Sequence, residues 1–162
     1  MNKPTVSMEH IGEMKLIYVR FRGTYLEFRK QSRKMFKTLF SFAEQHNLIV
    51  KDVTKVLTIY HDNPFITDAG NLRTSVAMTI PGDTAIEEND DVSVMSISGK
   101  FGVGHFELSP GEYGEAWQYM YQNWLFAEDV EPRDAVPFEL YVTEPPKNFR
   151  GKSFTDIYIP VN

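Results

Sequence analysis

The chain has 162 residues, a formal net charge of −5 at pH 7 and no cysteine. This length fits one domain or two small fused units. The negative charge argues against direct nucleic-acid binding, which needs clustered lysines and arginines, and the lack of cysteine excludes disulfide bonds and thiolate metal sites. No apolar run is long enough to span a membrane, so we expect a cytoplasmic protein without a membrane partner.

The first half has the pattern of a strand, a helix and two further strands. Apolar and polar side chains alternate in residues 17–22, the period of a half-buried strand. The helix that follows has apolar residues on one face, at Met35, Phe36, Leu39, Phe40 and Ala43. Residues 56–60 and 72–80 are predicted strands, and residues 6–10 add a short strand at the start.

The second half follows the same plan after an acidic linker at residues 82–91, which lacks the pattern of a calcium loop. Residues 92–98 open its first strand, and residues 113–125 form one long amphipathic helix. The apolar stripe of that helix contains Trp117 and Trp124, which we expect in the core. Residues 138–142 and 154–161 are the last two predicted strands.

Three short signatures recur in the same order, about eighty to ninety residues apart. They are Gly-x-Tyr from residues 23 and 111, Tyr-x-x-x-Pro from residues 60 and 141, and Ile-Pro from residues 80 and 159. The sequence therefore predicts a single α+β domain over residues 1–162, made of pseudo-repeats at about 6–81 and 92–161. Each half would form an antiparallel sheet with one long helix, and a ligand cleft would lie between the halves.

One strand of the second half carries a carboxylate among apolar residues. Alternation in this strand places Phe138, Leu140 and Val142 on one face, which we expect to pack on the helix. Glu139 and Tyr141 would then point away from the helix and into the cleft.

The same reasoning adds tyrosines from two other strands. Thr58 and Tyr60 of the first half correspond to Glu139 and Tyr141, so a carboxylate is what breaks the internal symmetry. In the last strand Ile157 and Ile159 suit the core, which leaves Tyr158 facing the cleft, with Thr79 as its counterpart.

The sharpest predicted constellation is thus Glu139 among Tyr60, Tyr141 and Tyr158. A buried carboxylate must be paired, hydrogen-bonded, hydrated or protonated, and a cationic ligand between aromatic rings is one way to satisfy it. A salt bridge within the fold, or a position at an open wet edge, is the alternative. Trp117, at a helix end, is placed among the ligand-contacting residues as well as in the core.

Other chemistries have little support in the sequence. The four histidines lack metal-ligand spacing, and we expect no metal and no cofactor. No nucleophile elbow precedes a helix, and Gly99, Gly102 and Gly104 lie between two predicted strands rather than at a helix start, so they do not form a phosphate loop. Residues 62–64 have turn chemistry, which Arg73 is expected to anchor.

These residues resemble the GyrI-like small-molecule-binding domain family, which is also the effector-binding domain of some AraC-type and MerR-type transcription regulators. The resemblance is carried in the first half by Ile59-Tyr60-His61-Asp62-Asn63-Pro64, Asn71-Leu72-Arg73 and Ile80-Pro81-Gly82. In the second half it is carried by Ile97-Ser98-Gly99-Lys100-Phe101, Gly111-Glu112-Tyr113, Ala116-Trp117, Phe138-Glu139-Leu140-Tyr141 and Tyr158-Ile159-Pro160-Val161.

The resemblance implies a tandem pair of strand–helix–strand–strand (SHS2-type) units with a pocket between them. In multidrug-sensing members a glutamate of the Phe-Glu-x-Tyr strand meets lipophilic cations in an aromatic cage. That role maps onto Glu139, with Tyr141 and Tyr158 beside it. Some members are inhibitors of DNA gyrase and others are hydrolases of cyclopropane-containing toxins.

We therefore expect a protein that binds a lipophilic, cationic small molecule, either as a stand-alone module or as a detached effector-binding domain with a separate DNA-binding partner. One alternative is a hydrolase with Glu139 as general acid or base, assisted by Tyr141 or Tyr158. The other alternative is a modulator of DNA gyrase that acts by protein contact.

Overall fold

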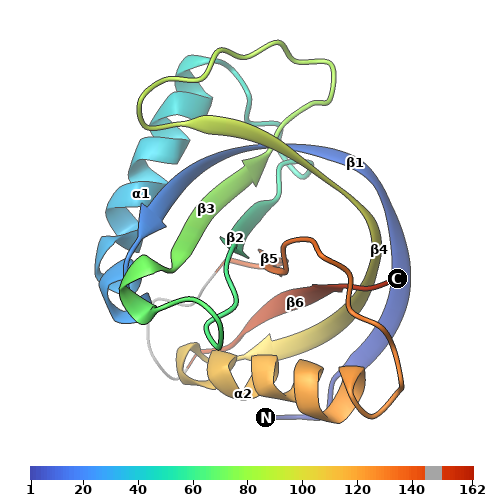
Figure 1. The fold of residues 1–162 in the computed structure, drawn as a ribbon. Coiled ribbons are helices and arrows are strands. Elements are labelled where there is room, and N and C mark those ends of the chain that lie inside the picture. Colours follow the sequence, from blue (N-terminus) through green and yellow to red (C-terminus); the bar gives the residue numbers. More distant parts are fainter. Residues whose placement is uncertain (145–150) are drawn as a thin grey trace. The chain divides into compact units, whose positions relative to one another are not determined.

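The computed structural model describes residues 1–144 and 151–162 and shows an α+β protein of antiparallel strands and helices (Figure 1). The chain forms two compact units. We call Gly12–Ser98 the α1 unit, and Met1–Ile11 with Gly99–Asn162 the α2 unit. Pro145, which closes the second Tyr-x-x-x-Pro signature, lies outside the described residues.

The α1 unit has the predicted order of strand, helix, strand and strand. Its elements are β1 (Thr5–Arg22, of which the unit includes the part from Gly12), α1 (Tyr25–Gln45), β2 (Val56–Tyr60), the short 3-10 helix η1 (Ala69–Asn71) and β3 (Arg73–Thr79). The central strand β3 pairs antiparallel with β1 on one side and with β2 on the other. All strands and the helix predicted for this half are confirmed, although residues 6–10 and 17–22 belong to one continuous strand.

The helix α1 begins at a capping box, in which Thr24 accepts from the backbone of Glu27 and the Glu27 side chain accepts from the backbone of Thr24. Its buried face carries Phe28, Met35, Leu39, Phe42 and Ala43. Phe36 is partly buried against this core, but Phe40 is exposed, so its predicted core position is wrong. Phe40 lies one position beyond Leu39 around the helix and therefore past the edge of the buried stripe.

The core of the α1 unit lies between α1 and one face of its sheet. Ile17, Val76 and Met78 are fully buried there, and Val19 and Phe21 pack against them. The residues that alternate with these on β1 therefore lie on the opposite face of the sheet.

The α2 unit repeats this plan. Its elements are β4 (Ser93–Leu108, of which the unit includes the part from Gly99), the 3-10 helix η2 (Pro110–Glu112), α2 (Tyr113–Gln118), the π-helical η3 (Tyr119–Leu125), β5 (Phe138–Tyr141) and β6 (Ser153–Pro160). The central strand β6 pairs antiparallel with β4 and with β5. The two units thus share the predicted order of strand, helix, strand and strand. They also share a feature that was not predicted, since the last strand of each unit is its central strand.

Two features of the second half differ from the sequence prediction. The strand predicted at 92–98 continues to Leu108, through glycines that interrupt the hydrophobic alternation. The single helix predicted over 113–125 changes from α-helical to π-helical hydrogen bonding after Gln118.

The boundaries of the two units fall within β1 and β4. Residues 82–91, the predicted linker, contain no helix or strand. The repeat boundaries at 6–81 and 92–161 and the cleft between the halves stay predictions. No helix in the described part of the chain is both long and apolar enough to cross a membrane.

Candidate functional site

The strand β5 buries the carboxylate of Glu139 inside the α2 unit. Glu139 is only 4 % exposed. The indole Nε1 of Trp117 donates to its Oε2 at 2.7 Å, and the hydroxyl of Tyr141 donates to its Oε1 at 2.9 Å. Hydrogen bonds to an ionised carboxylate stabilise its charge inside a protein. The indole of Trp117 and the phenol of Tyr141 therefore each stabilise the charged form of Glu139 between the helix and the sheet.

The register of β5 against β6 shows which face Glu139 occupies. Glu139 lies directly opposite Ile157, and Tyr141 lies opposite Thr155. Ile157 belongs to the core that also contains Ala116 of α2 and Met120 of η3. Side chains opposite each other in an antiparallel pair lie on the same face, so Glu139 and Tyr141 face the helix.

This corrects the predicted orientation of β5. Phe138 and Leu140 lie on the face that points away from α2, and Val142 follows the strand and is exposed. The prediction placed Phe138, Leu140 and Val142 on the helix-facing side of β5 because the face of a strand that packs on a helix is usually the apolar one. In this unit both faces of β5 are buried, so hydrophobicity alone does not distinguish them.

Two glycines of β4 make room for large side chains between the helix-facing side of the sheet and the helix. Gly102 lies opposite Ile159, and a Cβ atom on Gly102 would overlap the ring of Trp124. A Cβ on Gly104 would lie 2.5 Å from the sulfur of Met120. Trp124 and Met120 therefore rest directly on the backbone of β4, and the glycines serve packing rather than phosphate binding.

A second polar pair lies in the same layer. The hydroxyls of Tyr113, at the start of α2, and Thr155, on β6, are 2.8 Å apart. Burial is the main cause that raises the pKa of Tyr113, and the nearby charge of Glu139 adds to the rise. We call Tyr113, Trp117, Glu139, Tyr141 and Thr155 together the Glu139 site.

Tyr158 lies on the other face of the sheet. It is opposite Phe138 in the register, and the two rings stack with centroids 4.4 Å apart. Burial, and then the charges of Asp156 and Glu9, raise the pKa of Tyr158 to about 12. The prediction that Tyr158 shares a face with Glu139 is therefore wrong, although its placement away from the helix core is confirmed.

The prediction of Thr79 as the counterpart of Tyr158 is also wrong. In the α1 unit Leu57 lies opposite Ala77, as Phe138 lies opposite Tyr158 in the α2 unit, so the counterpart of Tyr158 is Ala77.

Tyr60 occupies the position in the α1 unit that Tyr141 has in the α2 unit. It lies opposite Thr74, and its ring meets Tyr25 of α1 edge-on at 5.7 Å. Tyr60 therefore also faces its own helix. Its predicted grouping with Glu139 stays a prediction.

Sequence reasoning missed Tyr113 and Thr155 as members of the site. The signal for Tyr113 was present, because Gly111-Glu112-Tyr113 repeats Gly23-Thr24-Tyr25 and thus marks equivalent helix starts. Thr155 has a similar signal, since the offset of 81 residues that relates Tyr60 to Tyr141 also relates Thr74 to Thr155.

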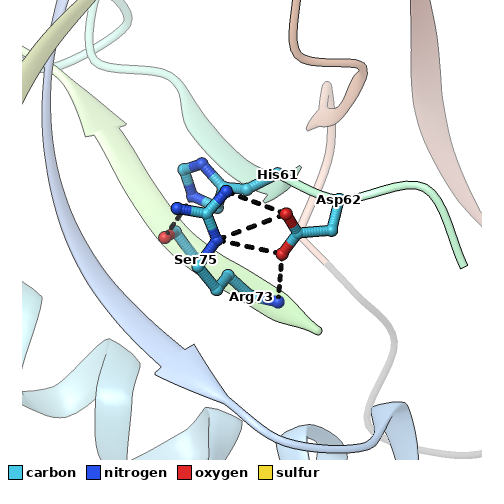
Figure 2. Close-up of polar contacts among 4 residues, drawn as sticks. All are labelled: His61, Asp62, Arg73 and Ser75. Carbon is cyan, nitrogen blue, oxygen red and sulfur yellow. Dashed lines mark hydrogen bonds and ion pairs between the residues drawn. The ribbon is translucent and has the colours of Figure 1, made fainter. Parts of the chain in front are cut away.

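The turn after β2 has the predicted anchor. The guanidinium of Arg73 donates to both carboxylate oxygens of Asp62, with Nη2 to Oδ1 at 2.8 Å, and the Arg73 backbone donates to the same carboxylate (Figure 2). These bonds from Arg73 lower the pKa of Asp62 to about 2.

No group of three or more His, Asp or Glu side chains in residues 1–144 and 151–162 is arranged to hold a metal ion.

The fold and this site define a doubled strand–helix–strand–strand domain with a carboxylate buried among aromatic side chains. Residues 4–162 match the model of the GyrI-like small molecule binding domain, and the chain belongs to that family. A curated relative, DNA gyrase inhibitor 2 of Dickeya dadantii, is 32 % identical over 112 residues, which cover 67 % of this chain and 68 % of that protein.

Solved structures support the same fold. The regulator EcmrR in its complex with DNA matches with a TM-score of 0.77 and 15 % identity, over 98 % of this chain and 57 % of that chain. This chain thus spans little more than half of EcmrR. SAV2435 bound to tetraphenylphosphonium matches with a TM-score of 0.65 and 13 % identity, over 98 % of this chain and 94 % of that one.

Proposed function

We propose that this protein binds a lipophilic, cationic small molecule through the Glu139 site. The observation that carries the proposal is the carboxylate of Glu139, 4 % exposed and held by Trp117 and Tyr141. A carboxylate in a low-dielectric layer attracts a cation far more strongly than one in water does. Aromatic faces add about 0.5–2 kcal/mol for each favourable cation–π contact.

The burial of Glu139 also sets a requirement for ligand entry. At 4 % exposure the carboxylate has no open path to a bulky ligand, so side chains between the helix and the sheet must move when the ligand binds. The π-helical segment η3 packs in the same core as Ile157, the residue opposite Glu139 on β6. We therefore expect ligand affinity to include the free-energy cost of that rearrangement.

Two comparisons favour this ligand class. SAV2435, which has the same fold, was solved with tetraphenylphosphonium, a bulky lipophilic cation. EcmrR, which also has the same fold, was solved in complex with DNA. We infer that the chain acts in the cytoplasm as a small-molecule sensor, of the kind that serves AraC-type or MerR-type regulators in multidrug recognition.

The test is calorimetric titration of tetraphenylphosphonium into three proteins: the unaltered chain, Glu139→Gln and the control Glu115→Gln. The control Glu115→Gln makes the same change, from a carboxylate to an amide, at an exposed position of α2. We expect Glu139→Gln to bind at least tenfold more weakly and Glu115→Gln to match the unaltered chain. Equal affinities in all three proteins would remove the role given to Glu139.

Inhibition of DNA gyrase is a second candidate, favoured by the 32 % identity to DNA gyrase inhibitor 2 of Dickeya dadantii. The test is a supercoiling assay with purified gyrase and increasing amounts of this protein. Loss of supercoiling at a stoichiometric ratio would support inhibition by protein contact. Full supercoiling at a large excess would exclude it.

A further inference from the structure

The sheet of the α1 unit carries a cluster of arginines on the face that points away from α1. Val19 and Phe21 of β1 pack toward α1, so their neighbours Tyr18, Arg20 and Arg22 lie on the other face. Arg73 and Ser75 of β3 share this face, since Arg22 lies opposite Arg73 and Arg20 lies opposite Ser75. We call these five residues, together with His61, the β1 arginine face.

This arrangement brings positive charges together. Like charges directly opposite each other in an antiparallel pair are destabilising, and Arg22 and Arg73 form such a pair. Asp62 compensates Arg73 through the bidentate contact already described (Figure 2). A protein of net charge −5 thus places three arginines on one face of this sheet, and only Arg73 among them contacts a carboxylate.

Arg20 and Arg22 keep their donors available. Both are exposed, and the guanidinium group of neither makes a hydrogen bond or an ion pair with another residue of the described chain. The hydroxyl of Tyr18 likewise has no hydrogen-bond partner there. A guanidinium presents several N–H groups in a planar fork that matches the oxygens of a carboxylate or phosphate.

His61 contributes a neutral imidazole to this face, and a hydrogen bond to Ser75 holds its ring in place. Its Nε2 lies 2.6 Å from the hydroxyl of Ser75 (Figure 2). Ser75 is fully buried, and the ring centroid of His61 lies 6.0 Å from that of Tyr18. Burial first, and then the charges of Arg73 and Arg20, lower the pKa of His61 to about 4. The imidazole is therefore neutral near pH 7 and adds no further positive charge.

We propose that the β1 arginine face binds an oxyanion, the phosphate or carboxylate group of a small molecule, through Arg20 and Arg22 with Tyr18 as a further donor. The bound anion compensates the charge that Asp62 leaves unpaired. This site belongs to the α1 unit and uses none of the residues of the Glu139 site.

The test compares the binding of inorganic phosphate and of acetate, at pH 7 and constant ionic strength, by calorimetry and by the rise in melting temperature. The variant Arg20→Gln/Arg22→Gln removes the two available guanidinium groups. The control Arg29→Gln/Arg33→Gln makes the same change in charge at exposed positions of α1. Because all four positions are exposed, we expect both variants to fold.

We expect the unaltered chain and the α1 control to bind alike, and Arg20→Gln/Arg22→Gln to bind at least tenfold more weakly to one or both anions. The single variants Arg20→Gln and Arg22→Gln should each show part of the loss. Equal binding in all proteins would overturn the proposal, as would a rise in melting temperature that chloride reproduces. Tight binding to duplex DNA at the same ionic strength, lost in the same variant, would also overturn it in favour of a nucleic-acid surface.

Discussion

The two units of this protein share the order of strand, helix, strand and strand, and β2 pairs with β3 in the same register as β5 with β6. Among the described residues, however, only the α2 unit buries a carboxylate. Thr58 and Tyr60 lie opposite Val76 and Thr74 in the α1 unit. Glu139 and Tyr141 lie opposite Ile157 and Thr155 in the α2 unit. The pair of a tyrosine opposite a threonine is common to both units, as Tyr60 with Thr74 and as Tyr141 with Thr155. The units differ at Glu139, where the α1 unit has Thr58.

The difference lies in the space between helix and sheet. Beside Val76 and Met78, β1 places Val19 and Ile17. At the equivalent positions beside Ile157 and Ile159, β4 places Gly104 and Gly102. The aliphatic side chains of β1 fill the core of the α1 unit. The glycines of β4 leave room for Trp124 and Met120, which occupy the space that the aliphatic side chains of β1 fill in the α1 unit.

The largest expected effect comes from filling this space. In Gly102→Ala the new Cβ would overlap the ring of Trp124, and overpacking of this kind costs roughly 1–3 kcal/mol or more. We expect the free energy of unfolding, measured by urea denaturation, to fall by about 3 kcal/mol. Gly12→Ala is the matched control on β1, where a Cβ would meet nothing within 4 Å, and it should change stability by less than about 1 kcal/mol.

The next effect tests the bond between Trp117 and Glu139. Trp117→Phe keeps an aromatic ring but removes the donor at 2.7 Å. A hydrogen bond to a charged group contributes about 1.5–3 kcal/mol, so we expect a loss of about 2 kcal/mol in the free energy of unfolding. A double-mutant cycle with Glu139→Leu, which leaves no acceptor for the indole, should give a coupling above about 1 kcal/mol. Additive effects of the two substitutions would contradict the contact.

Replacing either of two equivalent threonines by valine should change the stability of the protein, but in opposite directions. Thr155 is bonded to Tyr113, whereas Thr74 Oγ1 is a buried side-chain atom without a hydrogen-bond partner among the described residues. Thr155→Val should destabilise the protein by about 1 kcal/mol, and Thr74→Val should stabilise it by a similar amount, because an unsatisfied buried hydroxyl is removed. Thermal unfolding of both variants would show this. Changes of the same sign would contradict the proposed difference between the units.

The smallest effect concerns the turn of the α1 unit at acid pH. The pKa of Asp62 is lowered to about 2 by Arg73, so the stability from this pair is present above about pH 4 and is lost as the pH falls toward 2. Because Arg73 is 36 % exposed, we expect solvent to limit the contribution to about 1 kcal/mol or less. The difference in melting temperature between the unaltered chain and Asp62→Asn should be constant above pH 4 and should shrink below it. A difference that grows as the pH falls would contradict the pairing.

Much of the fold could be predicted from local patterns. The repeated Gly-x-Tyr signature marked equivalent helix starts at Tyr25 and Tyr113, and alternation on β1 correctly separated Val19 and Phe21 from Arg20. These features depend on residues near one another in the chain. The Ile-Pro signatures are two residues out of step, because Met78 rather than Ile80 is the counterpart of Ile159. The extension of β4 to Leu108 was missed because its glycines remove the apolar period that marks a strand.

The candidate site was predicted only in part. The sequence brought together Glu139, Tyr141 and Trp117, but it placed Tyr158 with them. Alternation tells which residues share a face of one strand, but not which face of β5 meets the helix. That choice depends on the register with β6 and on the indole of Trp117, which gives a buried carboxylate a donor on the helix side.

The most direct test of the central claim is a crystal structure of the protein with tetraphenylphosphonium. We predict the cation on the helix-facing side of β5, with its charged centre against the carboxylate of Glu139 and within about 6 Å of the Trp117 or Tyr141 ring centroid. A cation on the opposite face, against the stacked rings of Phe138 and Tyr158, would contradict it.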